Sequence, residues 1–290
     1  MKDVCQMKRF SLLLCVVLAA LELAACGAGF VPRQRKAEVM AAEAGWSCRL
    51  AMANMFDLVT CASPGRVEGG ILVVYVEGDG LAFLGPHAVS ADPTPREPAA
   101  LQLALRDPRA AAAYVARPCQ YTMAEGGRNC VPAYWTGRRY APEVVASMGA
   151  ALDIMKREAG AAQLVLAGYS GGGAMAVLLA AARSDVAGIV TVGANLDLAF
   201  WTGREGLTPL DGSLDPAQVA AKVQHIPQVH FTGEDDEVVA PAVAYSYLSH
   251  MTDGSRTIVV VVPGFDHDCC WVDRWHEISA RPELASIPGW

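Results

Sequence analysis

The chain has 290 residues, of which 53% are apolar, and a formal net charge of −7. This length and composition suffice for one sizeable hydrophobic core, and no internal repeat or low-complexity segment is visible. The acidic balance argues against a nucleic-acid partner, because proteins that bind nucleic acids present basic surfaces.

The first 25 residues have the pattern of an export signal. Lys8 and Arg9 precede an apolar run over 10–21, which is too short for a comfortable membrane span, and small residues follow. The tetrapeptide Leu23-Ala24-Ala25-Cys26 resembles the lipobox of bacterial lipoproteins, and this resemblance implies that Cys26 carries lipid. We therefore expect export and a lipid anchor in the membrane of the bacterial cell envelope, facing the periplasm. The alternative is an ordinary signal peptide with a chance cysteine.

The segment after the signal divides into two parts by pattern. Residues 26–43 are polar and weakly patterned, so we expect a tether there and a folded domain over 44–290. Export favours disulfides among the domain's six cysteines. Close spacing predicts the pairs Cys48–Cys61 and Cys119–Cys130, whereas adjacent Cys269 and Cys270 form a vicinal pair or stay reduced. No C-x-x-C spacing is present, so no metal site is expected.

Strand and helix patterns alternate along the domain. The first two strands, 48–55 and 56–61, are expected to pair antiparallel. Apolar, β-branched runs then predict buried strands over 71–76, 111–116, 163–169, 186–192, 229–232 and 257–262. Helical patterns fall between them, over 99–106, from 142 to 159, directly after 170 and over 241–251. This alternation predicts an α/β fold with a mostly parallel, doubly wound sheet.

One junction of strand and helix has a special sequence. The strand 163–169 ends in Gly168-Tyr169-Ser170-Gly171-Gly172, and an Ala-rich helix begins at once. Small residues around a serine at such a turn let the hydroxyl stand above the sheet edge. The motif G-x-S-x-G in this setting resembles the nucleophile elbow of the α/β-hydrolases. A plain Gly-rich connection between two core elements is the alternative.

The rest of the chain supplies the partners that an α/β-hydrolase needs, in the family's order. An acidic loop follows the strand 229–232, and by its resemblance to the family's acid loop the acid is Asp236, with Asp235 left open as the alternative. His267 follows the last strand, where the family places its histidine. The resemblance thus implies a triad of Ser170, His267 and Asp236.

The loops around this triad supply further candidates. The resemblance implies an oxyanion hole from Gly171 and from the loop Asp79-Gly80, which follows the strand 71–76. Substrate-binding candidates are Tyr169 on the elbow and Arg117 and Trp135 on the long loop after the strand 111–116. Arg117 and Arg139 have an alternative role as buried arginines that pair with a carboxylate. The loop after the strand 186–192 is short, so we expect short cap loops and an open site.

These features predict a serine hydrolase that acts through an acyl-enzyme, most simply a carboxylesterase, on a small acyl or ester substrate and without a cofactor. A peptidase or an acyltransferase would use the same triad. A non-catalytic binding lipoprotein on this scaffold is a third interpretation. The resemblance covers the chain from Cys48 onward and does not specify the acyl group.

Overall fold

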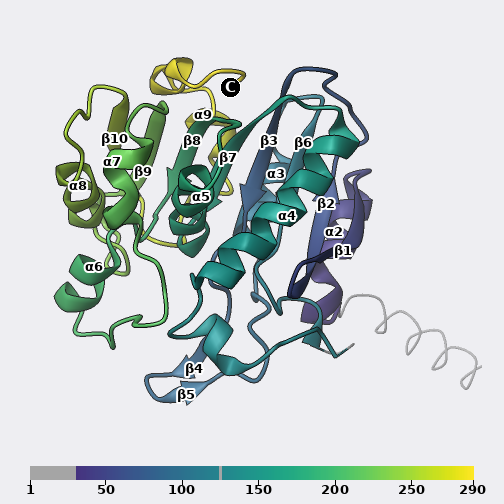
Figure 1. Ribbon diagram of the computed structural model, residues 1–290, viewed down its shortest axis with the longest axis horizontal. Coiled ribbons are helices and arrows are strands. Elements are labelled where there is room, and N and C mark those ends of the chain that lie inside the picture. The colour runs from purple at the N-terminus through teal and green to yellow at the C-terminus, as the bar shows by residue number, and fades with distance from the viewer. Residues whose placement is uncertain (1–30, 124–125) are drawn as a thin grey trace, which may run out of the picture. The chain divides into compact units, whose positions relative to one another are not determined.

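The computed structural model describes residues 31–123 and 126–290 of the chain (Figure 1). The expected signal over 1–25 and the expected lipidation site Cys26 lie outside these residues, so both stay predictions. No helix in the described part of the chain is long and apolar enough to cross a membrane.

The centre of the domain is an eight-stranded sheet with the strand order β1-β2-β6-β3-β7-β8-β9-β10. The first two strands, β1 (Ser47–Ala53) and β2 (Phe56–Ala62), form an antiparallel pair, and β2 runs antiparallel to β6. From β6 to β10 every neighbouring pair is parallel. These strands are β6 (Ala112–Val115), β3 (Ile71–Val76), β7 (Gln163–Tyr169), β8 (Val186–Val192), β9 (Gln228–Gly233) and β10 (Thr257–Val262).

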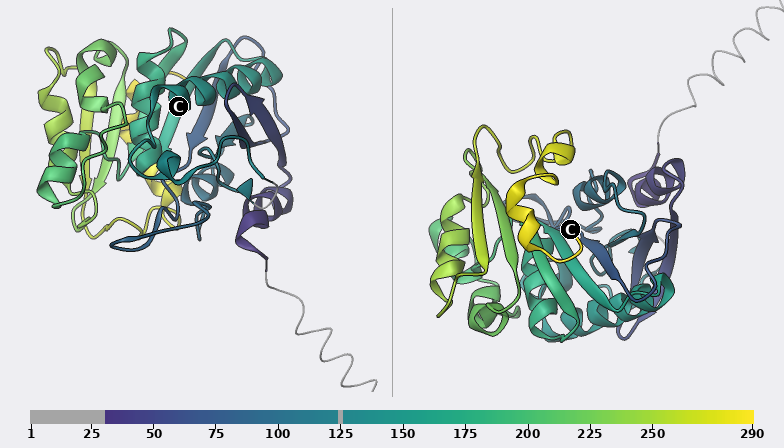
Figure 2. Two further views of the ribbon diagram at one scale, coloured as in Figure 1. Left: turned by 60° about the horizontal axis from the view of Figure 1, so that its bottom comes forward. Right: turned by 90° about the horizontal axis from the view of Figure 1, so that it is seen from above.

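Helices cover both faces of the sheet, as Figure 2 shows. One face packs against α4 (Pro142–Ala159), α5 (Gly171–Ala181), α7 (Ala220–Val223) and α8 (Pro241–Ser249). The other packs against α2 (Lys36–Glu43), α3 (Ala99–Leu105), α9 (Trp275–Ile278) and the 3-10 turn η5 (Pro282–Ser286). The predicted doubly wound α/β sheet is confirmed. Because the strands β3 and β6–β10 are parallel, their C-terminal ends share one edge of the sheet, called here the carboxyl edge.

The sequence of α4, the longest helix in the described residues, fixes where this helix begins and ends. Pro142 occupies the first turn of α4, where a missing N–H costs nothing, and Gly160 ends the helix in the left-handed conformation with φ 71°. Between them, Val144, Met148 and Leu152 form a fully buried stripe that faces the sheet. The end of α4 then leads directly into β7 and the candidate site.

The prediction of a tether over 26–43 is wrong from Arg33 onward, because this part is folded into the domain. A 3-10 turn η1 (Arg33–Arg35) leads into α2, and Ala37 and Ala41 of this helix are buried in the core. Arg33–Trp290 forms one compact unit. All buried core residues of the described chain lie within this unit, so it contains the whole hydrophobic core. The folded domain therefore begins about one helix before residue 44.

Two further parts of the chain lie at the carboxyl edge: a hairpin and the connection between β8 and β9. A small antiparallel hairpin, β4 (Phe83–Gly85) and β5 (Ala88–Val89), follows β3 and projects from this edge in Figure 1. The connection between β8 and β9 contains α6 (Leu198–Arg204), the turn η4 (Pro216–Val219) and α7. The loop expected to be short after β8 thus contains two short helices, of which α7 packs on the sheet, and the hairpin is an element that the sequence pattern did not indicate.

All three pairs of cysteines in the domain are joined. Cys48 and Cys61 are direct cross-strand partners on β1 and β2, and their disulfide fixes the outer edge of the sheet. Cys119 and Cys130 close the first part of the long loop after β6. Both predicted pairs are therefore present. Cys269 and Cys270 form a vicinal disulfide directly after the loop that contains His267.

Candidate active site

Ser170 stands at a sharp turn between β7 and α5. Its backbone has φ 51° and ψ −123°, a conformation that non-glycine residues rarely adopt. The turn is held by its surroundings, since the N–H of Ser170 donates to the carbonyl of Val192 at 2.8 Å. A Cβ atom on Gly172 would collide with the carbonyl oxygen of Val76, so only glycine allows the helix to begin this close to β3. The local sequence thus forces the serine hydroxyl out at the carboxyl edge.

Three side chains from three separate strand ends form one hydrogen-bonded chain. Ser170 Oγ lies 3.1 Å from Nε2 of His267, and Nδ1 of His267 lies 2.9 Å from Oδ2 of Asp236. Ser170 follows β7, Asp236 follows β9 and His267 follows β10. The structure therefore brings together the three residues that the sequence pattern selected. The imidazole is only 13% exposed and the Asp236 side chain is fully buried.

The structure separates the two candidate acids. Asp236 Oδ1 accepts hydrogen bonds from the N–H groups of Val238 at 2.9 Å and Val239 at 2.7 Å, which leaves Oδ2 free to face His267. Asp235 is exposed, and only its backbone N–H is fixed, by the carbonyl of Phe265 at 2.9 Å. Adjacent residues at this strand end point in opposite directions, so only Asp236 reaches the imidazole.

The loop that carries His267 is fixed from both sides. Asp266 Oδ1 accepts the N–H groups of Asp268 and Cys269 at 2.9 and 2.6 Å, and the indole of Trp271 donates to the Asp266 carbonyl at 2.9 Å. Tyr169 donates its hydroxyl to the carbonyl of His267 at 2.8 Å. Burial, reinforced by nearby carboxylates, raises the pKa of Tyr169, so this phenol stays a donor. The hydroxyl of Tyr169 thus holds the histidine loop, while the expected contact of this half-buried side chain with substrate stays a prediction.

The loop after β3 passes directly beside the serine. A Cβ atom on Gly78 would lie 3.5 Å from Cβ of Ser170, in ordinary contact. Within residues 31–123 and 126–290, the N–H groups of Asp79 and Gly171 donate to no protein acceptor. The N–H of Gly80 likewise donates to no protein acceptor in these residues, and a Cβ atom on Gly80 would meet the carbonyl of Pro93 and the amide of Gln120. The N–H groups of Asp79, Gly80 and Gly171 are thus all without a protein acceptor, and Gly171 directly follows the serine.

The side chain of Asp79 anchors this loop through a buried charge network. Its carboxylate lies 3.2 Å from Nη1 of Arg117 and 2.6 Å from Nη1 of Arg139, and the hydroxyl of Tyr140 donates to it at 3.0 Å. Burial disfavours the charged carboxylate, but Arg139 and Arg117 outweigh this effect and lower the pKa of Asp79. Asn195 extends the network, since its amide donates to the Tyr140 hydroxyl at 3.1 Å. Asp79 therefore stays ionised and bonded.

Arg117 links this network to the elbow. Its Nη1 also donates to the carbonyl of Gly171 at 3.2 Å, and its Nη2 donates to the carbonyl of Arg139. Only 4% of Arg117 and 8% of Arg139 are exposed. The expectation that Arg117 contacts substrate is therefore wrong, and the alternative, a buried arginine paired with a carboxylate, is correct. The sequence could not show this pairing because Asp79 lies far away in the chain.

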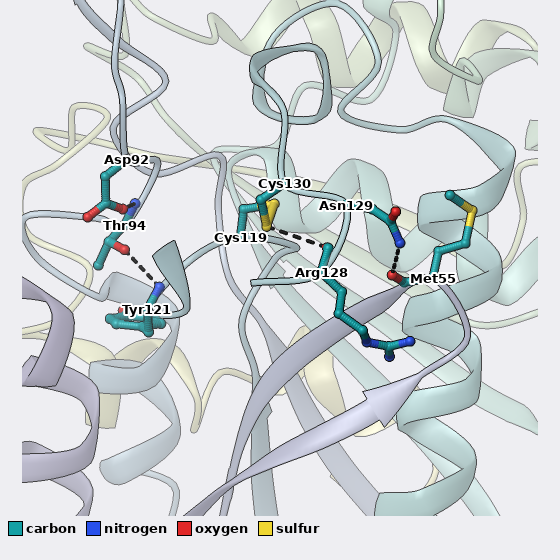
Figure 3. Close-up of a disulfide and its surroundings, with 8 residues drawn as sticks. All are labelled: Met55, Asp92, Thr94, Cys119, Tyr121, Arg128, Asn129 and Cys130. Carbon is teal, nitrogen blue, oxygen red and sulfur yellow. Dashed lines mark hydrogen bonds between the residues drawn. A yellow bond between two sulfur atoms is a disulfide. The ribbon is translucent and has the colours of Figure 1, made fainter. Parts of the chain in front are cut away.

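Trp135 is likewise not at the surface of the site. It is 3% exposed, and its indole donates to the carbonyl of Ser90 at 3.0 Å, which ties the long loop to the segment after β5. Its expected contact with substrate is therefore replaced by a packing role. The disulfide Cys119–Cys130 stiffens the same loop, and Figure 3 shows Asn129 beside it donating to the carbonyl of Met55 at 2.6 Å.

Glu77 is a buried acid that sequence reasoning did not select. Its Oε1 accepts the N–H groups of Gly78 at 3.0 Å and Ala100 at 3.2 Å, so it connects the loop after β3 to the start of α3. Burial raises the pKa of Glu77 from 4.5 to about 7, although these hydrogen bonds oppose the shift. The only sequence signal is a charged residue at the end of a wholly apolar strand. No group of His, Cys, Asp and Glu in the described residues is arranged to hold a metal ion.

Solved structures with the same architecture span almost the whole domain. Est1E from Butyrivibrio proteoclasticus superposes with a TM-score of 0.57 at 14% identity, over 82% of this chain and 98% of its own. This chain has the α/β-hydrolase fold. An esterase of Pyrococcus furiosus gives 0.59 at 8% identity, over 86% and 94% of the two chains. The α/β-hydrolase GrgF from a Penicillium species gives 0.59 at 13% identity, over 83% and 97%. Neither a protein-family model nor a curated protein sequence matches the chain.

Proposed function

We propose that this protein is a serine hydrolase that cleaves small carboxylic esters through a covalent acyl-enzyme. The observation that carries the proposal is the continuous hydrogen-bonded chain from Ser170 through His267 to Asp236. A serine hydroxyl is a weak nucleophile unless a positioned base takes its proton, and this arrangement supplies both the base and the group that orients it. The esterases among the structural neighbours are compatible with this activity, although at such low identity they support only the fold.

In the proposed reaction, Ser170 Oγ attacks the acyl carbon of the ester while its proton moves to Nε2 of His267. Asp236 holds the proton on Nδ1, keeps the imidazole in the correct tautomer and stabilises the imidazolium that forms. His267 then gives its proton to the departing alcohol, which leaves the acyl group on Ser170. Water enters, His267 removes its proton, and attack on the acyl carbon releases the acid and restores the serine.

The negative oxygen that forms during each attack needs donors that are already in place. The N–H groups of Asp79 and Gly171 are the proposed donors, because both are free of protein acceptors beside Ser170. The buried ion pairs of Asp79 hold its loop, and the bond from Arg117 to the Gly171 carbonyl holds the start of α5. Arg117 and Arg139 therefore act as positioning residues in this proposal.

Labelling by a fluorophosphonate tests the nucleophile directly. The parent protein is expected to take up one label, and Ser170→Ala is expected to take up none. Ser255→Ala is the matched control, because Ser255 is an exposed serine outside the site. Failure of the parent to react would remove the hydrolase proposal and favour a binding role. A panel of esters of increasing acyl length, with amide and alcohol acceptors added, then separates esterase, peptidase and acyltransferase activity.

The proposed location is the periplasmic side of a bacterial membrane, with a lipid anchor on Cys26. This proposal rests on the sequence Leu23-Ala24-Ala25-Cys26 that follows the apolar run. Cys26→Ser is expected to leave the protein soluble or unprocessed, which fractionation and a shift in gel mobility would reveal. Identical fractionation of parent and variant would rule out the anchor and leave the hydrolase proposal intact.

A further inference from the structure

Most of the exposed large apolar side chains in residues 31–123 and 126–290 lie at one end of the domain. β1 runs in the same direction as the parallel strands, because it is antiparallel to β2 and β2 is antiparallel to β6. The end of β1, the hairpin and the loops after β6, β8 and β9 therefore all lie at the carboxyl edge. These segments contain the exposed residues Met52, Met55, Phe83, Leu84, Val89, Val131, Phe200, Leu207, Leu214 and Val238. Exposed apolar side chains at one end of a domain are candidates for an interaction surface, and the hairpin contributes three that lie close together in sequence, Phe83, Leu84 and Val89.

The hairpin β4–β5 is the most exposed part of this surface. Phe83 is 41% exposed, Leu84 62% and Val89 44%, and no Asp, Glu, Lys or Arg occurs over residues 81–91. Figure 1 shows the hairpin projecting from the carboxyl edge, beyond the rest of the domain. The only titratable side chain of this segment is the exposed His87, between β4 and β5. Transfer of the apolar side chains of the hairpin out of water lowers the free energy. Val238, two residues after Asp236, is also exposed, at 52%.

The folded domain begins beside the same hairpin. Arg33 pairs with the carboxylate of Asp92 at 3.1 Å, and Gln34 donates to it at 2.8 Å. Asp92 follows the hairpin within a few residues and also accepts the N–H of Thr94, whose hydroxyl accepts the N–H of Tyr121 (Figure 3). The start of the domain is thus fixed to the segment around Asp92, which also forms the base of the hairpin.

The length of the linker limits where this end of the domain can be. Only residues 27–32 separate Cys26 from Arg33, and a fully extended chain of that length spans at most about 25 Å. A lipid on Cys26 would therefore keep Arg33 within that distance of the bilayer, and Asp92 at the base of the hairpin is paired with Arg33.

We propose that the β4–β5 hairpin inserts Phe83 and Leu84 into a lipid surface, so that the carboxyl edge and Ser170 face the membrane. The inference rests on the proposed anchor and hydrolase activity, and it assigns the substrate class: acyl esters that partition into the bilayer. The attraction is apolar rather than electrostatic, because the chain is acidic overall and the hairpin contains no Asp, Glu, Lys or Arg. Docking should therefore depend little on salt.

Sedimentation with phosphatidylcholine vesicles tests whether the hairpin binds a bilayer on its own. The protein used has neither the lipid anchor on Cys26 nor any hydrolytic activity. The chain from Gly27 onward contains the whole compact unit, and Ser170→Ala removes any hydrolysis. Phe83→Ser with Leu84→Ser is expected to lower the partition coefficient at least about tenfold, because two apolar side chains lose their insertion. The matched control is Leu50→Ser with Tyr245→Ser, which are 46% and 50% exposed on β1 and α8. The control should stay within about twofold of the parent.

Each outcome decides the question. A parent that does not bind vesicles, or equal losses in both double variants, would overturn the proposal. So would a change of oligomeric state by light scattering in the Phe83→Ser/Leu84→Ser variant alone, which would assign the surface to a second copy of the chain. Circular dichroism checks that both variants fold, as expected for exposed positions. If the vesicle result holds but the active parent hydrolyses no ester, only the hydrolase proposal fails.

Discussion

Replacing Asp236 by asparagine tests the proposed triad at its most constrained point. The carboxylate uses one oxygen for the N–H groups of Val238 and Val239 and the other for His267. An asparagine has only one oxygen. If that oxygen keeps the two backbone N–H groups, the amide NH₂ must face Nδ1 of His267. The imidazole then accepts at Nδ1 and carries its proton on Nε2, which points at Ser170 and can no longer take the serine proton.

The size of the expected loss follows from this geometry. A wrong tautomer in a serine protease lowers turnover by about 10⁴-fold, which corresponds to about 5 kcal/mol in the activation free energy. Rotating the asparagine by half a turn would restore the bond to His267 but would leave the N–H groups of Val238 and Val239 without their acceptor, at a cost of about 1–3 kcal/mol for the buried N–H of Val239. We therefore expect Asp236→Asn to lose about 10⁴-fold in kcat.

Asp235→Asn is the matched control. It removes the same charge at the neighbouring position, where the side chain is exposed. Its expected loss is below about tenfold, since exposed charges are screened by solvent and salt. Steady-state kinetics on a chromogenic short-chain ester gives both values, and thermal melting shows whether each variant is folded. A larger loss in Asp235→Asn would assign the acid to Asp235. Two small losses in folded proteins would refute the triad proposed here.

Three further predictions concern the surroundings of the site. Arg139→Gln should lower the free energy of unfolding by about 3 kcal/mol in urea titrations, because it leaves Asp79 buried and only partly paired, whereas exposed Arg138→Gln should change it little. Since burial raises the pKa of Glu77 from 4.5 to about 7, the folded state binds the extra proton. The free energy of unfolding should therefore fall as the pH rises from about 4.5 to about 7. Glu77→Gln should remove up to about 3 kcal/mol of this pH-dependent loss. Replacing Cys119 and Cys130 by serine should cost about 2–4 kcal/mol, and an unchanged melting temperature would contradict a structural disulfide.

Local sequence determined the order of strands and helices and two members of the proposed triad. Ser170 was visible because glycines crowd a strand-to-helix turn, and this steric requirement is written into adjacent residues. His267 was visible because it follows a strand in a set order. The parallel sheet followed from alternating apolar patterns, since each pattern reflects the burial of its own segment.

Tertiary structure alone decided the features that depend on distant partners. Asp236 and Asp235 have the same chemistry, and only the fold turns one inward and the other to solvent. Arg117 had no visible partner in its own loop, because Asp79 reaches it from another strand end. The helix α2 was expected to be a tether, since short helices gain most of their stability from packing, here of small alanines against a core that the local sequence does not contain. A pattern in the chain reports what each segment buries, whereas the partner that covers it is set by the fold.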